Sequence, residues 1–178
     1  MLLSLNCPFR RRGAKIAMIL CVGAASLTSL QATAGHDGPL YEVRITNATY
    51  AQQFTPLLLV THESPVRLFE IGSAASSGLA TLAEEGNVAP LRATLDAEAK
   101  VNMTAAGAAL TNPGTTVTFT IRGRPTRDKL SLAAMLIPTN DAFFALNGIE
   151  LPRGDDTLTV TAPAYDAGSE KNDELCAS

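Results

Sequence analysis

Two neighbouring segments, residues 115–122 and 130–137, constrain the fold of this chain most strongly. In the first, Val117, Phe119 and Ile121 alternate with threonine residues. Such strict alternation is typical of an antiparallel strand with one buried and one solvated face. The second segment is the most apolar strand-like stretch of the chain, so we predict that it lies in the centre of a sheet. A polar turn at residues 124–128 joins the two segments.

Further short segments extend the strand pattern along the chain. Their β-branched and apolar content predicts three more strands, and the Asn-Pro-Gly sequence at residues 112–114 is a strong turn signal. Short strands separated by turns indicate an all-β fold, an antiparallel β-sandwich. The additional strands are residues 43–46, 57–61 and 158–161, and residues 67–71 form either an edge strand or a turn.

One region between the strands predicts helices instead. Ser76 or Ser77 can cap a helix that carries Leu79, Leu82 and Ala83 on one face and ends at Gly86. Pro90 suits the start of a second short helix over residues 91–99. We therefore expect one or two short helices, packed across one end of a sheet and without contact to a ligand.

The first 34 residues predict a signal peptide rather than part of the fold. Arg10, Arg11, Arg12 and Lys15 form a positive region, and an apolar segment at residues 16–30 follows it. The Ala32-Thr33-Ala34 sequence resembles a cleavage site. The apolar segment is too short for a membrane anchor. We predict export with cleavage, which leaves a single mature domain at residues 35–178 that is secreted or periplasmic.

Removal of the signal peptide makes the chain distinctly acidic. All 17 acidic residues but only 10 of the 14 basic residues lie after position 34, so the net charge becomes −7. An acidic domain is a poor partner for nucleic acid or for anionic lipid on its own. Cys176 is the only cysteine of the mature chain, which excludes an intrachain disulfide. Its tail position predicts either a thiol without a role or an intermolecular link.

Three carboxylates lie in turn sequences near the end of the chain. Asp141 follows the break at Pro138, and Asp166 and Glu170 flank Gly168. Calcium takes about six to eight oxygen ligands, and loops can bend to supply them. These residues are therefore candidate calcium ligands. Acidic residues in turns also commonly stay solvated or cap helices, and the spacing alone does not separate the two readings.

The chain also resembles the N-terminal domain of spondins, which occurs in animal matrix proteins and as stand-alone secreted bacterial proteins. The resemblance runs from about Tyr41 to about Glu174 and rests on the order and spacing of several short pieces. It implies a sandwich similar to C2 domains, with one calcium ion held by loop carboxylates at one end. The matching pieces are residues 41–47, 54–56, 61–62, 67–72, 79–86, 135–148 and 166–170.

The resemblance implies the metal role for Asp141, Asp166 and Glu170. Animal members commonly carry Asp at the last of these positions, so Glu170 departs from the pattern by one methylene group and could bind bidentately. Backbone carbonyls and water would complete the shell. The implied function is adhesion or recognition at the cell surface, with an unknown protein or cell-surface ligand as partner.

Other residues give weaker signals. Four further acids, Asp155, Asp156, Asp173 and Glu174, are expected to be solvated, although one of them could be an extra ligand. Phe143 and Phe144 follow the Asp141 turn. We expect one of them in the core and the other partly exposed. An exposed phenylalanine would favour a second function, calcium-dependent binding to a membrane surface.

No enzyme motif is evident. His62 ends a predicted strand without a recognisable nucleophile near it, so we interpret it as a structural hydrogen-bonding residue rather than a catalytic base. Zinc would need several His or Cys ligands, which the sequence does not group. A hydrolase is therefore the least favoured function. A purely structural envelope protein without a ligand is the remaining alternative.

Overall fold

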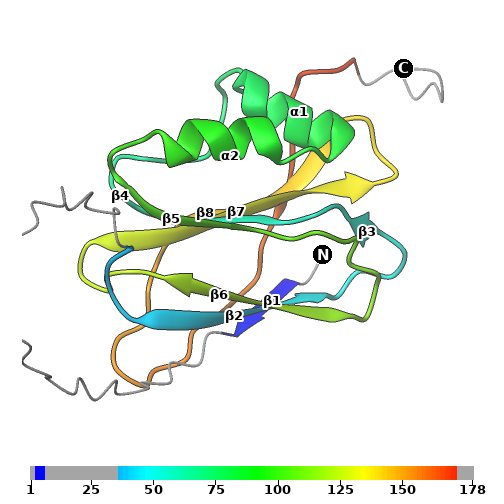
Figure 1. Ribbon diagram of the computed structural model, residues 1–178. Coiled ribbons are helices and arrows are strands. Elements are labelled where there is room, and N and C mark those ends of the chain that lie inside the picture. The colour runs from blue at the N-terminus through cyan, green and yellow to red at the C-terminus, as the bar shows by residue number, and fades with distance from the viewer. Residues whose placement is uncertain (1–2, 7–35, 172–178) are drawn as a thin grey trace, which may run out of the picture.

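The computed structural model describes residues 3–6 and 36–171, and it contains two antiparallel sheets and two helices stacked as three layers (Figure 1). The first sheet has the strand order β6-β2-β1-β9, and the second has the order β10-β8-β7-β4-β5 with β3 beside β7. The predicted all-β sandwich is confirmed. The first sheet comprises β1 (Leu3–Asn6), β2 (Leu40–Asn47), β6 (Thr116–Arg122) and β9 (Thr159–Val160); the second comprises β3 (Gln53–Phe54), β4 (Leu58–Glu63), β5 (Val101–Ala106), β7 (Asp128–Ile137), β8 (Ala142–Glu150) and β10 (Ala164–Asp166).

The main core lies between the two sheets. β2 pairs with β6 over seven residues, from Leu40 opposite Arg122 to Thr46 opposite Thr116. Alternate residues of β2 face inward, which explains why Val43 and Ile45 are fully buried. They meet the inward face of the second sheet, including Phe54 and Phe144, whose ring centroids lie 4.3 Å apart.

The predicted central strand is confirmed as β7. It pairs with β4 on one side and with β8 on the other, so nearly all of its residues are buried. Both faces of this strand are covered, one by the first sheet and one by the helices, which requires a continuous apolar sequence rather than an alternating one.

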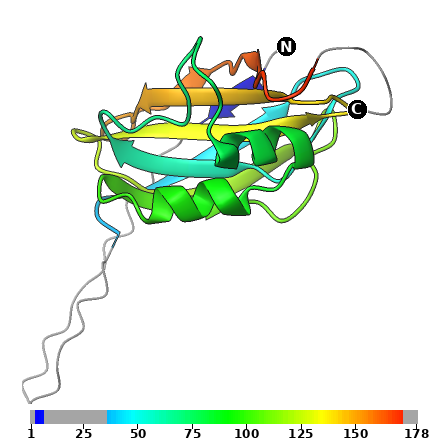
Figure 2. The ribbon, with the colours of Figure 1, turned by 90° about the horizontal axis from the view of Figure 1, so that it is seen from above.

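Helices α1 (Ser77–Glu85) and α2 (Ala89–Asp96) cover the outer face of the second sheet (Figure 2). The Ser76 side chain accepts a hydrogen bond from the Leu79 N–H and so caps α1, which ends at Gly86 with a positive φ of 68°. A second apolar cluster forms between α1, α2 and the sheet. The helices therefore lie across a face, not across one end as expected, because both have apolar residues to bury against it.

Several elements differ from the sequence-based prediction. β5 and β8 were not predicted, and α2 begins two residues earlier than expected and ends at Asp96. Residues 67–71 contain no strand, which leaves the turn of the two alternatives. β1 lies within the predicted signal peptide, yet it occupies the first sheet between β2 and β9. No helix of the described residues is long and apolar enough to span a membrane.

Candidate metal centre and adjoining pocket

Asp141 lies in the turn between β7 and β8 and is almost completely buried, with 2% of its surface exposed. Its Oδ2 accepts hydrogen bonds from the backbone N–H groups of Ser169 and Glu170, at 2.9 and 3.1 Å. The Ser169 hydroxyl lies 3.4 Å from the same oxygen. A single carboxylate oxygen therefore fixes the segment after β10 against the β7–β8 turn.

Asp166 is the last residue of β10, and Glu170 lies on the segment that follows it. β10 pairs with β8 so that Asp166 is opposite Ala142, and the Ala167 N–H donates to the Asp141 carbonyl at 3.2 Å. Oδ1 of Asp166 accepts the Gly168 N–H at 2.7 Å, and the positive φ of Gly168 (65°) lets the chain turn back toward Asp141. The two segments that the sequence analysis assigned to one site therefore lie side by side.

Asp141 forms no ion pair with another described residue. Its hydrogen-bond donors are two backbone amides and a hydroxyl. A buried carboxylate without a counter-charge carries a desolvation cost that neutral donors offset only in part. The site is therefore one that a bound cation would stabilise.

The donor chemistry fits calcium, while the geometry is not that of a complete cage. Carboxylates on two loops are the hard oxygen ligands that calcium prefers. Among the described residues, no three His, Cys, Asp or Glu side chains converge as a metal-binding cluster. Binding by Asp141, Asp166 and Glu170 thus stays a prediction, and it requires backbone carbonyls or water for the rest of the shell.

Two of the four additional acids, Asp155 and Asp156, do not join this site. Asp155 and Asp156 are exposed in a turn beyond the far end of β8. β8 has nine residues, and a strand rises about 3.4 Å per residue, so this turn is roughly 30 Å from Asp141. The expectation that these two acids are solvated is confirmed. Asp173 and Glu174 lie outside the described residues, as does Cys176.

A comparison with models of protein families identifies a match over most of the chain. Residues 45–173 match the family model Spondin_N. The chain belongs to the spondin N-terminal domain family. Among curated proteins, none matches it in sequence. The resemblance noted in the sequence is thus confirmed, and with it the assignment of a spondin-type module. The family is not a known enzyme family.

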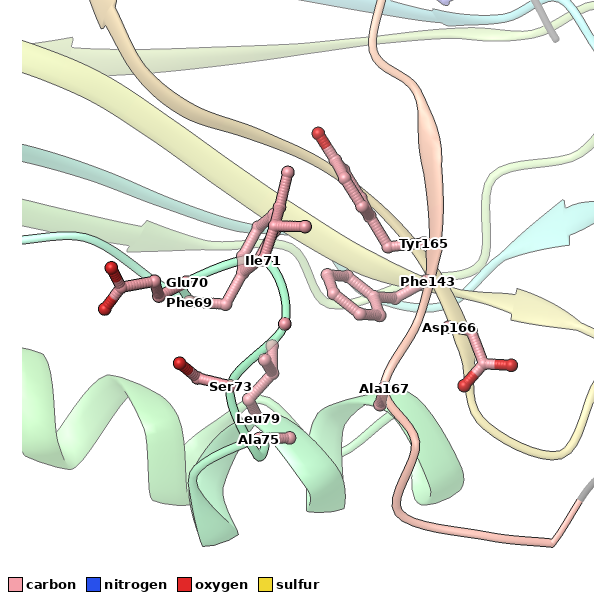
Figure 3. A pocket seen from close by; sticks show the side chains of 11 residues that line it. Phe69, Glu70, Ile71, Ser73, Ala75, Leu79, Phe143, Tyr165, Asp166 and Ala167 are labelled. Carbon is pink, nitrogen blue, oxygen red and sulfur yellow. The ribbon is translucent and has the colours of Figure 1, made fainter.

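A small pocket of about 90 Å³ adjoins the carboxylate segment of this spondin domain (Figure 3). Three aromatic rings pack together at it, with centroids 4.7 to 5.6 Å apart. Phe143 and Tyr165 come from paired strands, and Phe69 comes from the loop between β4 and α1. Ile71, on the same loop, lines the pocket and is 80% exposed. Asp166 and Ala167 form the opposite wall, so the pocket and the carboxylate loop share a segment.

Phe143 and Phe144 are both buried in the spondin domain, at 2% and 0% exposure. Phe144 points into the sandwich core, and Phe143 points to the helix side. The expectation that one of them is partly exposed is therefore wrong, because β8 is covered on both faces. Neither side chain is available for insertion into a membrane in this conformation.

His62 has a partner that the sequence analysis missed. Its Nε2 lies 2.7 Å from Oγ of Ser131 on the adjacent strand β7, and both side chains are fully buried. The Glu63 carbonyl can only accept, so Nδ1 of His62 carries the proton of the neutral ring and donates to it at 3.2 Å. Nε2 then accepts the hydroxyl proton of Ser131, whose Oγ in turn accepts the Gly148 N–H at 2.8 Å.

Burial lowers the pKa of His62 below its usual value of 6.5, against smaller opposing effects of the Glu63 carbonyl and the Asp128 charge. The ring is therefore held neutral, as this hydrogen-bond arrangement requires. The prediction of a structural hydrogen-bonding His62 is confirmed, and the sequence did not identify Ser131 as its partner.

Proposed function

We propose that this spondin domain is a secreted calcium-binding module that works in adhesion or recognition at the cell surface. The observation that carries the proposal is the burial of Asp141 without an ion pair to any described residue, in contact with the segment that holds Asp166 and Glu170. The net charge of −7 after removal of the first 34 residues favours cation binding over anion binding.

Each residue has a distinct part in this proposal. Asp141 is positioned by the β7–β8 turn and reaches the segment after β10, while Asp166 and Glu170 bring carboxylates from that segment. Bound calcium would supply the counter-charge and hold the two loops together. A calcium ion that fixes the 166–170 segment would also fix one wall of the neighbouring pocket, because Asp166 and Ala167 line it. The exposed Ile71 and this pocket then form the proposed recognition face.

Export is part of the proposal. It is supported by the basic, apolar and small-residue regions of the first 34 residues. It also agrees with the typical extracellular location of spondin domains. Export would expose the site to millimolar calcium, a concentration that suits the weak calcium affinity typical of extracellular modules.

Thermal melts in calcium, in magnesium and in chelator test the calcium site. We expect a calcium-selective rise in Tm, which corresponds to about 2.7 kcal/mol at a calcium concentration 100 times Kd. Asp141→Asn and Asp166→Asn should abolish the rise. Asp166 is the more informative position because it is exposed, whereas Asp141 is buried and also holds the loop through the N–H groups of Ser169 and Glu170.

Asp156→Asn is the matched control, because it removes the same charge from an exposed turn far from the site. It should keep the full calcium response. Identical wild-type melts in all three solutions would overturn the calcium proposal. A rise that persists in both Asp141→Asn and Asp166→Asn would place the metal elsewhere.

A further inference from the structure

The first sheet contains a slot that is one strand wide. β2 and β9 do not pair with each other; β1, seen beside β2 in Figure 1, lies between them and pairs with both. Four residues of β1 lie opposite β2, and two of them also lie opposite β9. A chain without β1 in this place would have two facing strand edges and an unfilled gap between them.

The edge of β2 that faces the slot carries a defined set of hydrogen-bonding groups. On the other edge, Asn47 donates its N–H to the Thr115 carbonyl, next to β6. Because backbone groups point to opposite edges at successive residues of an antiparallel strand, the N–H groups of Thr46 and Arg44 point into the slot. Unpaired groups of this kind are a template for another strand.

The slot also sets a side-chain pattern for whatever fills it. Residues directly opposite each other in a ladder share a face of the sheet. The β1 position opposite Ile45 also lies opposite Val160, and Ile45 is fully buried in the sandwich core. An apolar side chain suits this position and the one opposite Asn47. The positions opposite Thr46 and Arg44 share the outer face, where a polar side chain suits.

The occupant of the slot belongs to the predicted signal peptide. Residues 3–6 precede the expected cleavage site at Ala34, so cleavage would remove the strand that fills the first sheet. We propose that processing opens the slot, and that the mature protein then accepts an extended segment of a partner polypeptide as an added strand. The inference rests on the proposed export and cleavage, but not on the calcium site.

The chemistry of the partner follows from the slot. Backbone hydrogen bonds to Thr46 and Arg44 would provide much of the affinity, and side chains at alternate positions would provide specificity. The fitting sequence has apolar residues two positions apart with polar residues between them, the pattern of Leu3 to Asn6. The partner segment is therefore extended and antiparallel to β2, rather than helical.

Hydrogen exchange at β2 tests the proposal on the exported protein, whose N-terminus is first determined by mass spectrometry. We expect the amides of Arg44 and Thr46 to exchange rapidly in the processed protein, while those of Val43 and Ile45, which face β6, stay protected. A synthetic peptide of residues 1–8 carrying Cys7→Ser should slow the exchange of Arg44 and Thr46 by at least tenfold. The same peptide with Ser4→Pro, or with Leu5→Asp, should not.

If mass spectrometry finds residues 1–34 retained, the proposed cleavage fails, and the slot is then tested in the full chain. There Ser4→Pro should expose Arg44 and Thr46, and the added peptide should protect them again. Two results would overturn the slot itself in either protein. One is strong protection of Arg44 and Thr46 without peptide, which would mean that β9 closes onto β2. The other is an open edge that the peptide leaves unprotected at millimolar concentration.

Discussion

Asp128 and Asp141 lie at opposite ends of β7 and are buried to almost the same degree, with 1% and 2% exposure. Their partners differ. Asp128 receives the guanidinium of Arg124, with Nη2 2.7 Å from Oδ1, and also the Arg124 backbone N–H at 2.8 Å. Asp141 receives only backbone amides and a hydroxyl. The two carboxylates are thus equally buried, but the partners of Asp128 include a positive charge and the hydrogen-bond donors of Asp141 are neutral.

The comparison separates a structural carboxylate from a candidate ligand. The charge of Asp128 is balanced by Arg124, four positions earlier in the chain. The hydrogen bond between the two side chains raises the pKa of Arg124. Asn102 donates to the same carboxylate, which ties β5 to the start of β7. The group at this end of the strand needs nothing from solution. At the other end, Asp141 organises a loop but has no ion-pair partner among the residues that the structure describes, which is the arrangement that a cation would complete.

The largest effect is expected from breaking the ion pair between Arg124 and Asp128 at the start of β7. Arg124→Ala should lower the free energy of unfolding by about 3 kcal/mol, because removal of one partner leaves a buried carboxylate unpaired. Urea unfolding measures this loss, which should be the same in calcium and in chelator. Arg124→Lys should recover only part of it, since an ammonium group cannot form the forked contact with Asp128.

Arg127→Ala is the matched control for this variant. Arg127 pairs with Glu63 at 2.6 Å but is 60% exposed, so its loss should cost less than about 1 kcal/mol. Equal losses for the two arginine variants would contradict the assignment of Asp128 as the group that depends on Arg124. A calcium-dependent loss in Arg124→Ala would show that the two ends of β7 are not independent.

A smaller, pH-dependent effect is expected from the neutral polar pair between the two carboxylates. The pKa of His62 is lowered in the folded state, chiefly by burial, relative to about 6.5 in the unfolded state. Below pH 6.5 the unfolded chain therefore binds the proton first. Stability should be fully present above pH 6.5 and should fall as the pH decreases toward the folded-state pKa, by at most about 1.4 kcal/mol per pH unit.

Urea unfolding between pH 7 and 5 measures how steeply the free energy of unfolding changes with pH. His62→Gln should remove the part of this change that comes from His62. An amide can still exchange a hydrogen bond with Ser131, so the variant keeps the contact while it loses the titration. A slope of the same size in His62→Gln would assign the pH dependence to other groups.

The sequence predicted the elements whose pattern is local. The alternation at residues 115–122 and the apolar run at 130–137 became β6 and β7, and Ser76 and Gly86 mark the ends of α1 as expected. β5 and β8 were missed for physical reasons. All residues of β5 except Thr104 are of intermediate exposure, and β8 is buried on both faces in its first half, so neither strand alternates between buried and exposed positions.

The site was predictable only to the extent that the family pattern located its loops. Resemblance pointed to Asp141 and to the segment of Asp166 and Glu170, and the structure places these segments in contact. The burial of Asp141 and the aromatic pocket depend on long-range packing. The His62–Ser131 contact joins residues 69 positions apart, which no local pattern reveals.

The smallest effect is expected at the hydroxyl of Ser169. Its contact with Asp141 is long, at 3.4 Å, and the backbone N–H of the same residue donates to the same oxygen at 2.9 Å. Ser169→Ala should therefore cost less than about 0.5 kcal/mol and should leave the calcium-dependent rise in Tm unchanged.

Ser131→Ala is the matched comparison, because the backbone N–H of Ser131 does not duplicate the contacts of its hydroxyl. Ser131 accepts from Gly148 and faces His62, so its loss leaves buried groups unsatisfied and should cost about 2 kcal/mol. A Ser169→Ala variant that loses as much stability as Ser131→Ala, or that loses its calcium response, would contradict this assignment. The hydroxyl would then be an essential part of the loop, and backbone donors alone would not suffice to hold Asp141.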